Sequence, residues 1–363
     1  MSFSLGIIGL PNVGKSTLFN VLSRAGANVS NYPFCTIDPN IGVVEVPDER
    51  LIQVQKIIGS KVALPTVIEF YDIAGLVKGA HKGEGLGNQF LSHIRETAAV
   101  LQVVRCFADP SIIHVEGAVD PKRDIELINA ELILSDLATI AKKFEGVKSA
   151  IKAGDKKILQ YMHLLEKIKN ELDRGIPARV PLASISHEDC ELLTDLSLLT
   201  AKPVLYVANV DETGNPDQVR EIEQIAKQEG AGVVALCAKL ENEIAELPPA
   251  DAQAYLKEVG LDEAGLSRVI HAGYKLLDLI TFFTANTKEA RAWAIKRGTT
   301  VVNAAGKVHS DMGKGFISAE VIHYKDLIAL GSYAGAREKG LLHTEGKTYV
   351  VQDGDLILVR FVV

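Results

Sequence analysis

The chain has 363 residues, of which 47% are hydrophobic and 23% are charged, an ordinary composition for a folded protein of two or three domains that excludes a largely disordered chain. Its formal net charge of −7 argues against a generally basic surface that binds nucleic acid indiscriminately, although a local basic face is compatible with it. No basic segment precedes the first apolar run and no apolar run is long enough to span a bilayer, so we expect a cytoplasmic protein without a membrane partner.

Strand-like and helical segments alternate in the first part of the chain, and the alternation returns after residue 200. Leu5–Gly9 is a short apolar strand, and Lys15–Ser23 begins an amphipathic helix after a glycine-rich turn. Further strand-like segments are 42–46, 66–71, 100–107, 203–209 and 232–237. This pattern predicts an α/β fold with a doubly wound, mainly parallel sheet, formed by residues 1–120 and 200–276.

Residues 121–199 have a different character, with apolar residues at three- and four-residue steps. The two series are Leu127, Ala130, Leu134, Leu137, Ala141 and Phe144, and Ile158, Met162, Leu165, Ile168 and Leu172. They predict two long amphipathic helices in an inserted antiparallel coiled-coil hairpin, with a break at Ala153–Asp155 and a stop at Gly175–Pro177. The lysine-rich tip, 142–157, is either a solvated surface or a contact for RNA or an acidic partner.

Residues 277–363 contain short alternating segments separated by turn signals, at 280–284, 299–302 and 350–359. We predict a small α+β domain of β-grasp-like type there. Its candidates for a local basic face are Lys307, His309, Lys314, Arg337, Lys339 and Lys347.

The segment Gly9-Leu-Pro-Asn-Val-Gly-Lys-Ser-Thr17 has the complete P-loop pattern between a strand and a helix. In this motif, backbone N–H groups surround the phosphates, Lys15 neutralises phosphate oxygens and the hydroxyl of Ser16 binds Mg²⁺. The predicted nucleotide-binding residues of the loop are Asn12, Val13, Gly14, Lys15, Ser16 and Thr17. The sequence therefore predicts a site for a nucleoside triphosphate with Mg²⁺.

Two further segments complete the predicted phosphate site. Asp72-Ile-Ala-Gly75 follows a strand, where the carboxylate can hold a Mg²⁺-bound water and the glycine N–H can meet the γ-phosphate. Thr36, in a predicted loop with no apolar period, is the candidate for a second hydroxyl ligand. We therefore predict Ser16, Thr36 and Asp72 as metal ligands, and Lys15 and Gly75 as catalytic residues.

These motifs, together with Asn31-Tyr-Pro-Phe-Cys-Thr-Ile-Asp-Pro39 and Tyr349-Val-Val-Gln-Asp-Gly-Asp355, resemble the YchF (Obg-like ATPase) subfamily of translation-factor-class P-loop proteins. The resemblance covers essentially the whole chain, and implies a nucleotide domain, an inserted coiled coil and a terminal TGS domain. It also implies a nucleotide-driven factor associated with ribosomes, including the large subunit, with possible RNA contact through the coiled-coil and TGS domains.

The base that the site binds is predicted from the segment at the end of the strand at 203–209. Guanine-binding relatives read it with Asn-Lys-x-Asp, whereas this chain has Asn209-Val-Asp-Glu212. A carboxylate placed for guanine would face the bare ring nitrogen of adenine, so a polar Asn209 beside an apolar Val210 suits adenine better. Cys237 begins a loop that resembles the Ser-Ala-Lys loop of such base pockets. We expect ATP to be preferred, with GTP as the alternative.

The group that positions the attacking water is also open. Many related GTPases have a glutamine after Asp-x-x-Gly, but this chain has Leu76, so intrinsic hydrolysis should be slow. His114 and His81 are candidate water-positioning residues, each of which is otherwise an ordinary surface histidine. Asn12 is the residue type that helps to hold K⁺ in related enzymes, although it is also a common turn residue.

Two functions from different classes remain open. The first is a slow ATPase that acts as a nucleotide-dependent switch on ribosomes, in translation or in a stress response. The second is a scaffold that binds ribosomes or RNA and holds ATP as a structural ligand. A metabolite or nucleic-acid kinase is less favoured, because the motifs form a translation-factor set rather than a phosphate-acceptor lid.

Overall fold

The computed structural model describes residues 3–24, 26, 38, 40–73, 86–148, 156–258 and 264–362. The chain divides into two compact units: unit 1 comprises residues 1–44 and 69–276, and unit 2 comprises residues 45–68 and 277–363. Residues 45–68, which the sequence analysis assigned to the nucleotide domain, therefore group with the C-terminal part of the chain. Among the helices in the described ranges, none is both long and apolar enough to cross a membrane.

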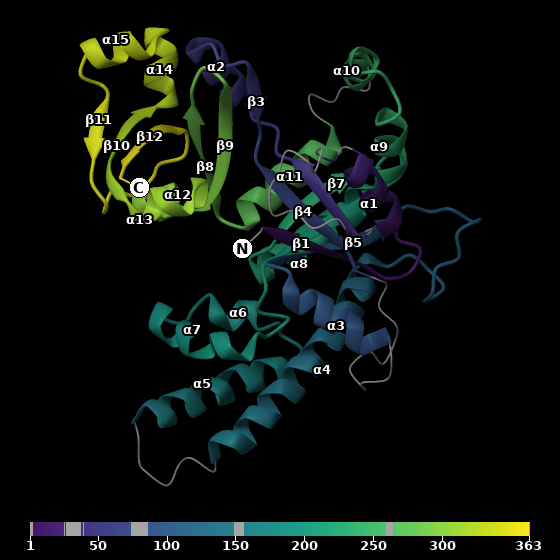
Figure 1. Ribbon diagram of the computed structural model, residues 1–363. Coiled ribbons are helices and arrows are strands. Elements are labelled where there is room, and N and C mark those ends of the chain that lie inside the picture. Colours follow the sequence, from purple (N-terminus) through teal and green to yellow (C-terminus); the bar gives the residue numbers. More distant parts are fainter. Residues whose placement is uncertain are drawn as a thin grey trace. The chain divides into compact units, whose positions relative to one another are not determined.

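Unit 1 contains a six-stranded sheet in the order β2-β4-β1-β5-β6-β7 (Figure 1). Its strands are β1 (Ser4–Ile8), β2 (Ile41–Glu45), β4 (Val67–Asp72), β5 (Ala99–Cys106), β6 (Val204–Val210) and β7 (Gly232–Leu236). The strands from β4 to β7 in this order are all parallel to their neighbours, which confirms the predicted doubly wound sheet. Their carboxyl ends therefore lie at one edge.

Helices cover both faces of this sheet. Tyr206 points to the face that α8 covers, since its hydroxyl reaches Glu229, whereas Leu5 points to the other face and lies under Gly273 of α11. The helices of unit 1 are α1 (Lys15–Arg24), α3 (Leu86–Glu96), α4 (Pro121–Lys148), α5 (Lys156–Asp173), α6 (Arg179–Leu182), α7 (His187–Leu193), the 3₁₀ helix η4 (Thr194–Leu196), α8 (Pro216–Glu229), α9 (Ala238–Ile244), α10 (Pro249–Glu258) and α11 (Gly265–Leu276).

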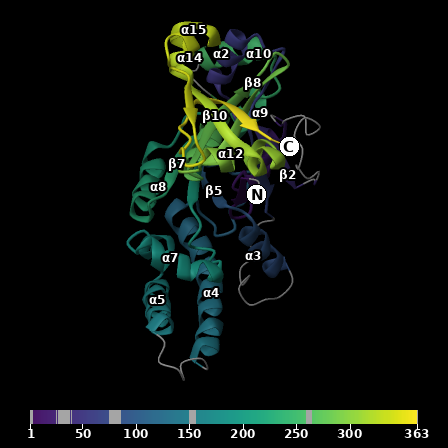
Figure 2. The same ribbon diagram turned by 60° about the vertical axis from the view of Figure 1, so that its left-hand side comes forward.

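The insertion contains the two long helices that its apolar spacing predicted. Helices α4 and α5 lie side by side and antiparallel (Figures 1 and 2), and Ile140, Leu165 and Ile168 are fully buried in the core between them. The predicted break at 153–155 lies outside the described residues. Gly175, with φ of 79°, turns the chain after α5, and the short helices α6, α7 and η4, which the sequence analysis did not predict, complete this core.

Unit 2 contains a mixed sheet in the order β11-β10-β12-β8-β9-β3. Its strands are β3 (Val62–Leu64), β8 (Leu279–Ala285), β9 (Glu289–Lys296), β10 (Phe316–His323), β11 (His343–Glu345) and β12 (Asp355–Phe361), and its helices are α2 (Glu49–Ile58), α12 (Val301–Val308), α13 (Ser310–Lys314), α14 (Tyr324–Leu330) and α15 (Tyr333–Glu338). The predicted α+β character is confirmed. The predicted strand at 299–302 is wrong, because Thr300 makes one isolated bridge to Val350 and then precedes α12.

The early segment of unit 2 helps to build its core. Helix α2 begins where the side chain of Asp48 accepts a hydrogen bond from the N–H of Arg50, and it ends at Gly59, whose φ is 75°. Leu51 and Val54 of this helix pack with Phe283 in one buried cluster. Strand β3 then adds to the sheet edge beside β9. Residues 45–68 are therefore an integral part of unit 2.

Candidate nucleotide-binding site

The segment between β1 and α1 has the backbone shape of a phosphate-binding loop. Asn12 and Gly14 have positive φ angles of 64° and 94°. A Cβ on Gly14 would lie 2.2 Å from Nδ2 of Asn209, so only glycine fits there. Helix α1 begins at Lys15, so its first N–H groups lie at the end of the loop, where anions bind favourably.

Lys15 and Asp72, predicted to bind phosphate and Mg²⁺ respectively, lie together in the structure. Nζ of Lys15 is 2.5 Å from Oδ1 of Asp72 and 2.8 Å from the carbonyl oxygen of Ile73. The sheet explains this proximity, because Ile7 of β1 pairs with Asp72 at the end of β4. Ser16 is exposed in the first turn of α1, and Thr17 is half-buried beside it.

Other predicted residues lie outside the part of the chain that the structure describes. These are Thr36, Gly75, Leu76 and His81. Their assigned roles therefore stay predictions.

Asn209 joins the P-loop to the loop after β7. It is buried, with its Nδ2 donating to the carbonyl of Val13 at 2.8 Å and its Oδ1 accepting from the N–H of Ala238 at 3.0 Å. The sequence analysis placed Asn209 against the base. In the structure, both ends of its amide hold backbone groups, so the residue fixes the loops on either side of it.

The residues around Val210 and Cys237 lie at the ends of two neighbouring strands, β6 and β7. Both side chains are partly buried, and burial raises the pKa of the Cys237 thiol, which favours its neutral form. Beside them, Nζ of Lys239 is 3.0 Å from Oε1 of Glu212, and this hydrogen bond raises the pKa of Lys239. Oδ1 of Asp211 accepts from the N–H and hydroxyl of Thr213.

His114 is not placed as the sequence analysis expected. It is buried rather than exposed in a loop, and its Nδ1 accepts from the N–H of Glu116 at 3.1 Å. Nε2 therefore carries the proton and donates to Oδ2 of Asp124, 2.8 Å away in the first turn of α4. Both ring nitrogens are engaged within the protein, so in this structure neither is available to position a water.

The loop after β5 contains a residue that the sequence analysis missed. Arg105, the penultimate residue of β5, is 2% exposed and donates to backbone carbonyls of the loop at Phe107, Asp109 and Ile112. The next carbonyl, that of Ile113, accepts from Nδ2 of Asn12 at 3.0 Å. The sequence did contain an indication of this role, because an arginine is unusual among the apolar residues of a predicted buried strand.

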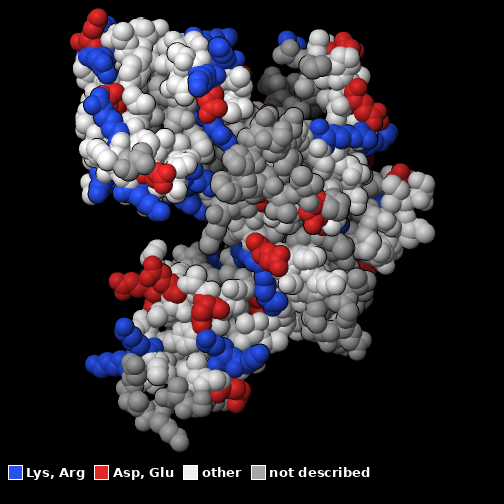
Figure 3. All heavy atoms as spheres, viewed as in Figure 1, with Lys and Arg blue, Asp and Glu red and all other residues white. Residues whose placement is uncertain are grey.

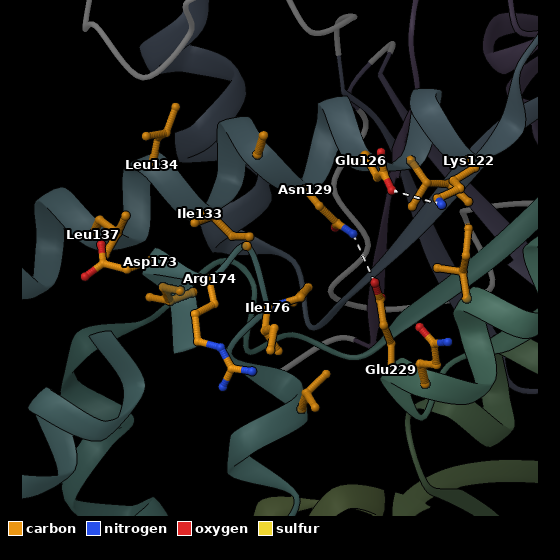
Figure 4. Close-up of a pocket in the computed structure, with 18 residues that line it drawn as sticks. Lys122, Glu126, Asn129, Ile133, Leu134, Leu137, Asp173, Arg174, Ile176 and Glu229 are labelled. Atoms are coloured by element: carbon orange, nitrogen blue, oxygen red, sulfur yellow. Dashed lines mark hydrogen bonds and ion pairs between the residues drawn. The ribbon is translucent and has the colours of Figure 1, made fainter. Parts of the chain in front are cut away.

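A second polar network lies at the base of the helical insertion, beside a cavity of about 930 Å³ (Figure 4). The cavity lies between α4, α8 and the turn that follows α5. Glu229, which lines the cavity, pairs with Arg179 at 2.8 Å and accepts from Asn129 and from the hydroxyl of Tyr206. This network fastens three helices to β6.

Two family profiles match the sequence. One, described as a 50S ribosome-binding GTPase, matches residues 4–132. The other, for the C-terminal domain of YchF GTPases and described as a protein of unknown function, matches residues 279–362.

Similar proteins match nearly the whole chain. "Ribosome-binding ATPase YchF" of Bacillus subtilis is 50% identical, with 99% of this chain and 100% of that protein covered. The protein of the same name from Escherichia coli O157:H7 is 51% identical, with 99% of each covered. The solved Schizosaccharomyces pombe YchF GTPase has a TM-score of 0.86 and 36% identity over 99% of this chain and 98% of that one. The chain therefore belongs to the YchF family.

Proposed function

We propose that this protein is a Mg²⁺-dependent ATPase that binds ribosomes and acts as a slow nucleotide-dependent switch in translation or stress regulation. The observation that carries the proposal is the P-loop with Lys15 beside Asp72 at the carboxyl edge of a parallel sheet. The relatives named ribosome-binding ATPases, which match along their whole length, support both the reaction and the partner.

The oxygen donors near the P-loop suit Mg²⁺. A hydroxyl from Ser16, a carboxylate from Asp72 and, by prediction, a hydroxyl from Thr36 are ligands of the kind that this cation prefers. These residues would hold Mg²⁺, which would supply neutralisation of phosphate charge. Lys15 would contact phosphate oxygens in place of Asp72, and Gly75 is proposed to donate its N–H to the γ-phosphate. Asn12 is proposed to help hold K⁺.

The contacts of the two acids after Val210 support adenine as the base. Asp211 accepts hydrogen bonds within its own turn and Glu212 pairs with Lys239, so each carboxylate already has partners in the protein. Val210 offers an apolar surface where guanine-binding relatives have a lysine. Phe107 directly follows Cys106, which pairs with Val210 in the sheet, and we propose its ring as a further wall of the base site.

Calorimetric binding of ATP and of GTP tests this assignment. The wild type should bind ATP more tightly, and Val210→Lys should move the preference toward GTP by about 10-fold, because the lysine stem covers a guanine ring. Tighter GTP binding by the wild type would overturn the choice of base.

Turnover measurements separate the switch from the scaffold. Hydrolysis of ATP should rise with ribosomes and with K⁺, and Lys15→Ala should lower it by about 100-fold or more, since one preorganised charge at the transferred phosphate is lost. If turnover depends on neither Lys15 nor ribosomes while ATP still binds, the scaffold function is the better description.

Unit 2 is the proposed source of RNA contacts on the ribosome. It contains 14 Lys and Arg against 12 Asp and Glu, a formal charge of +2, while the whole chain has −7. Figure 3 shows basic side chains gathered along the lower border of this unit, over α12 and α13. Lys307 and Lys314 lie in the last turns of these helices. Such a basic face can neutralise RNA phosphates on an otherwise acidic protein.

A further inference from the structure

We propose that Arg105 is a positioning residue of the nucleotide site, which fixes the loop after β5 against the P-loop and thereby sets the orientation of Asn12. The inference rests on the proposed ATPase function and adds to it a residue that acts through another.

The contacts of Arg105 are directed at the shape of one loop. Nε donates to the carbonyl of Phe107 at 3.1 Å, Nη1 to that of Ile112 at 3.1 Å and Nη2 to that of Asp109 at 3.3 Å. The guanidinium also lies 4.4 Å from the centre of the Phe107 ring. A buried cation costs free energy through desolvation, and a valine like its neighbours Val103 and Val104 would fill a strand position without that cost. In return, the hydrogen bonds of the arginine fix the backbone conformation of residues 107–112.

The position of Arg105 in the sheet places this loop beside the rest of the site. Arg105 pairs in register with Asn209, the residue that holds Val13 of the P-loop. The loop begins after Cys106, which pairs with Val210 at the end of β6, and β6 is the neighbour of β7, whose end precedes the predicted base loop. Arg105 and Asn209 thus organise the backbone around the proposed nucleotide site.

Asn12 completes the connection. Its Nδ2 donates to the carbonyl of Ile113, the residue after Ile112, whose own carbonyl Arg105 holds. Asn12 is exposed and its φ of 64° is unusual for a residue other than glycine, so this hydrogen bond is a specific restraint on it. Fixing the donor end of the amide also fixes where Oδ1, the end able to bind a cation, is directed.

Arg123 provides a matched control, because it holds the other end of the same loop. It donates to the carbonyls of Glu116 at 3.4 Å and Ala118 at 2.5 Å, and to Oδ1 of Asp124. These contacts are near the start of α4 rather than the P-loop. Arg105 still holds residues 107–112 when they are lost, so only residues 116–118 should loosen and Asn12 should stay in place.

The experiment compares Arg105→Lys, Arg105→Gln and Arg123→Gln in the full chain, with kcat and KM for ATP measured in KCl and in NaCl and with thermal unfolding as a check of folding. We expect Arg105→Lys to lower kcat in KCl by about 10-fold, since small misplacements of positioning groups have effects of this size. KM should change less, the advantage of K⁺ over Na⁺ should shrink, and Arg123→Gln should leave these values unchanged.

A double-mutant cycle with Asn12→Ala tests the route. If Arg105 acts through Asn12, Arg105→Lys should have little further effect on kcat once Asn12 is alanine. Fully multiplicative effects, or a folded Arg105→Lys protein with wild-type kcat and K⁺ response, would overturn the proposal. If the wild type shows no Lys15-dependent turnover, the ATPase function is rejected instead. The same double-mutant cycle is then measured by calorimetry as ATP affinity. Additive effects of the two substitutions on that affinity would again reject the role of Arg105.

Discussion

Two arginines of unit 1, the buried Arg105 and the partly buried Arg179, make different kinds of contact. At the nucleotide edge, Arg105 donates to three backbone carbonyls of one loop. At the base of the insertion, Arg179 pairs with the carboxylate of Glu229 and donates to Oδ1 of Asn129. The first arrangement gives a loop its path, and the second fastens helices to one another. The difference predicts that changes at the edge affect nucleotide chemistry, whereas changes at the base affect stability.

The largest effect is expected at the base of the insertion. Replacing Glu229 with alanine leaves the partly buried Arg179 without its charged partner, and should lower the free energy of unfolding of unit 1 by about 3 kcal/mol. Urea denaturation measures this. The matched control is Arg179→Met with Glu229→Leu, which removes both charges and should recover much of the loss. A single-variant loss no larger than that of the double variant would contradict the importance of the pair.

A somewhat smaller loss of stability, accompanied by weaker nucleotide binding, is expected from Asn209→Ala at the nucleotide edge. The carbonyl of Val13 and the N–H of Ala238 would both lose a hydrogen bond, which should weaken ATP binding by about 10-fold and destabilise the fold by about 1–2 kcal/mol. Calorimetry gives the affinity and denaturation gives the stability. Equal ATP affinity in this variant and the wild type would contradict the proposal that changes at the nucleotide edge affect nucleotide binding.

The buried carboxylate of Asp136, at the base of the insertion, should make the stability of unit 1 depend on pH. Burial raises the pKa of Asp136 above its usual value of 3.8, although the N–H groups of Leu199 and Thr200 and the hydroxyl of Thr200 donate to it. The folded state therefore binds this proton more readily than the unfolded state, and stability from this group falls as the pH rises from about 3.8 through the folded pKa. Relative to Asp136→Asn, the wild type should lose stability with rising pH in that window. A constant difference would contradict the raised pKa.

The smallest effect is expected on the exposed side of α8. Arg220 and Asp217 form an ion pair at 3.2 Å with both side chains largely exposed. Asp217→Ala should change the free energy of unfolding by no more than about 0.5 kcal/mol and leave ATP turnover unaltered. A larger change would contradict the small contribution assigned to this exposed ion pair.

The sequence predicted the parts of the molecule that local patterns determine. The P-loop, the parallel strands β1 and β5 to β7, and helices α4 and α5 follow from motif, apolar runs and helical spacing. The strand predicted at 299–302 failed because β-branched residues also occur in a buried helix face, and Val301 is completely buried in α12. Propensity alone does not separate these cases.

Local sequence patterns did not predict which side chains contact each other across the fold. His114 was expected to be free in a loop, but Asp124, ten residues later, folds back to hold its Nε2. Arg105 and Asn209 lie 104 residues apart and become neighbours only through the register of β5 and β6. Which hydrogen-bond donors meet which carbonyls depends on this long-range register, which no local pattern contains.

Residues 45–68 belong to unit 2 although they are synthesised long before the rest of it, and this has a consequence for folding during translation. Helix α2 and strand β3 leave the ribosome early, but Phe283, their partner in the core, and strand β9 lie more than two hundred residues later. At ordinary translation rates this is a wait of roughly 10–40 s. During that time the apolar side of α2, with Leu51 and Val54, lacks its final partners. In a newly made copy, the apolar side of α2 therefore stays without these partners until β8 and β9 have been synthesised.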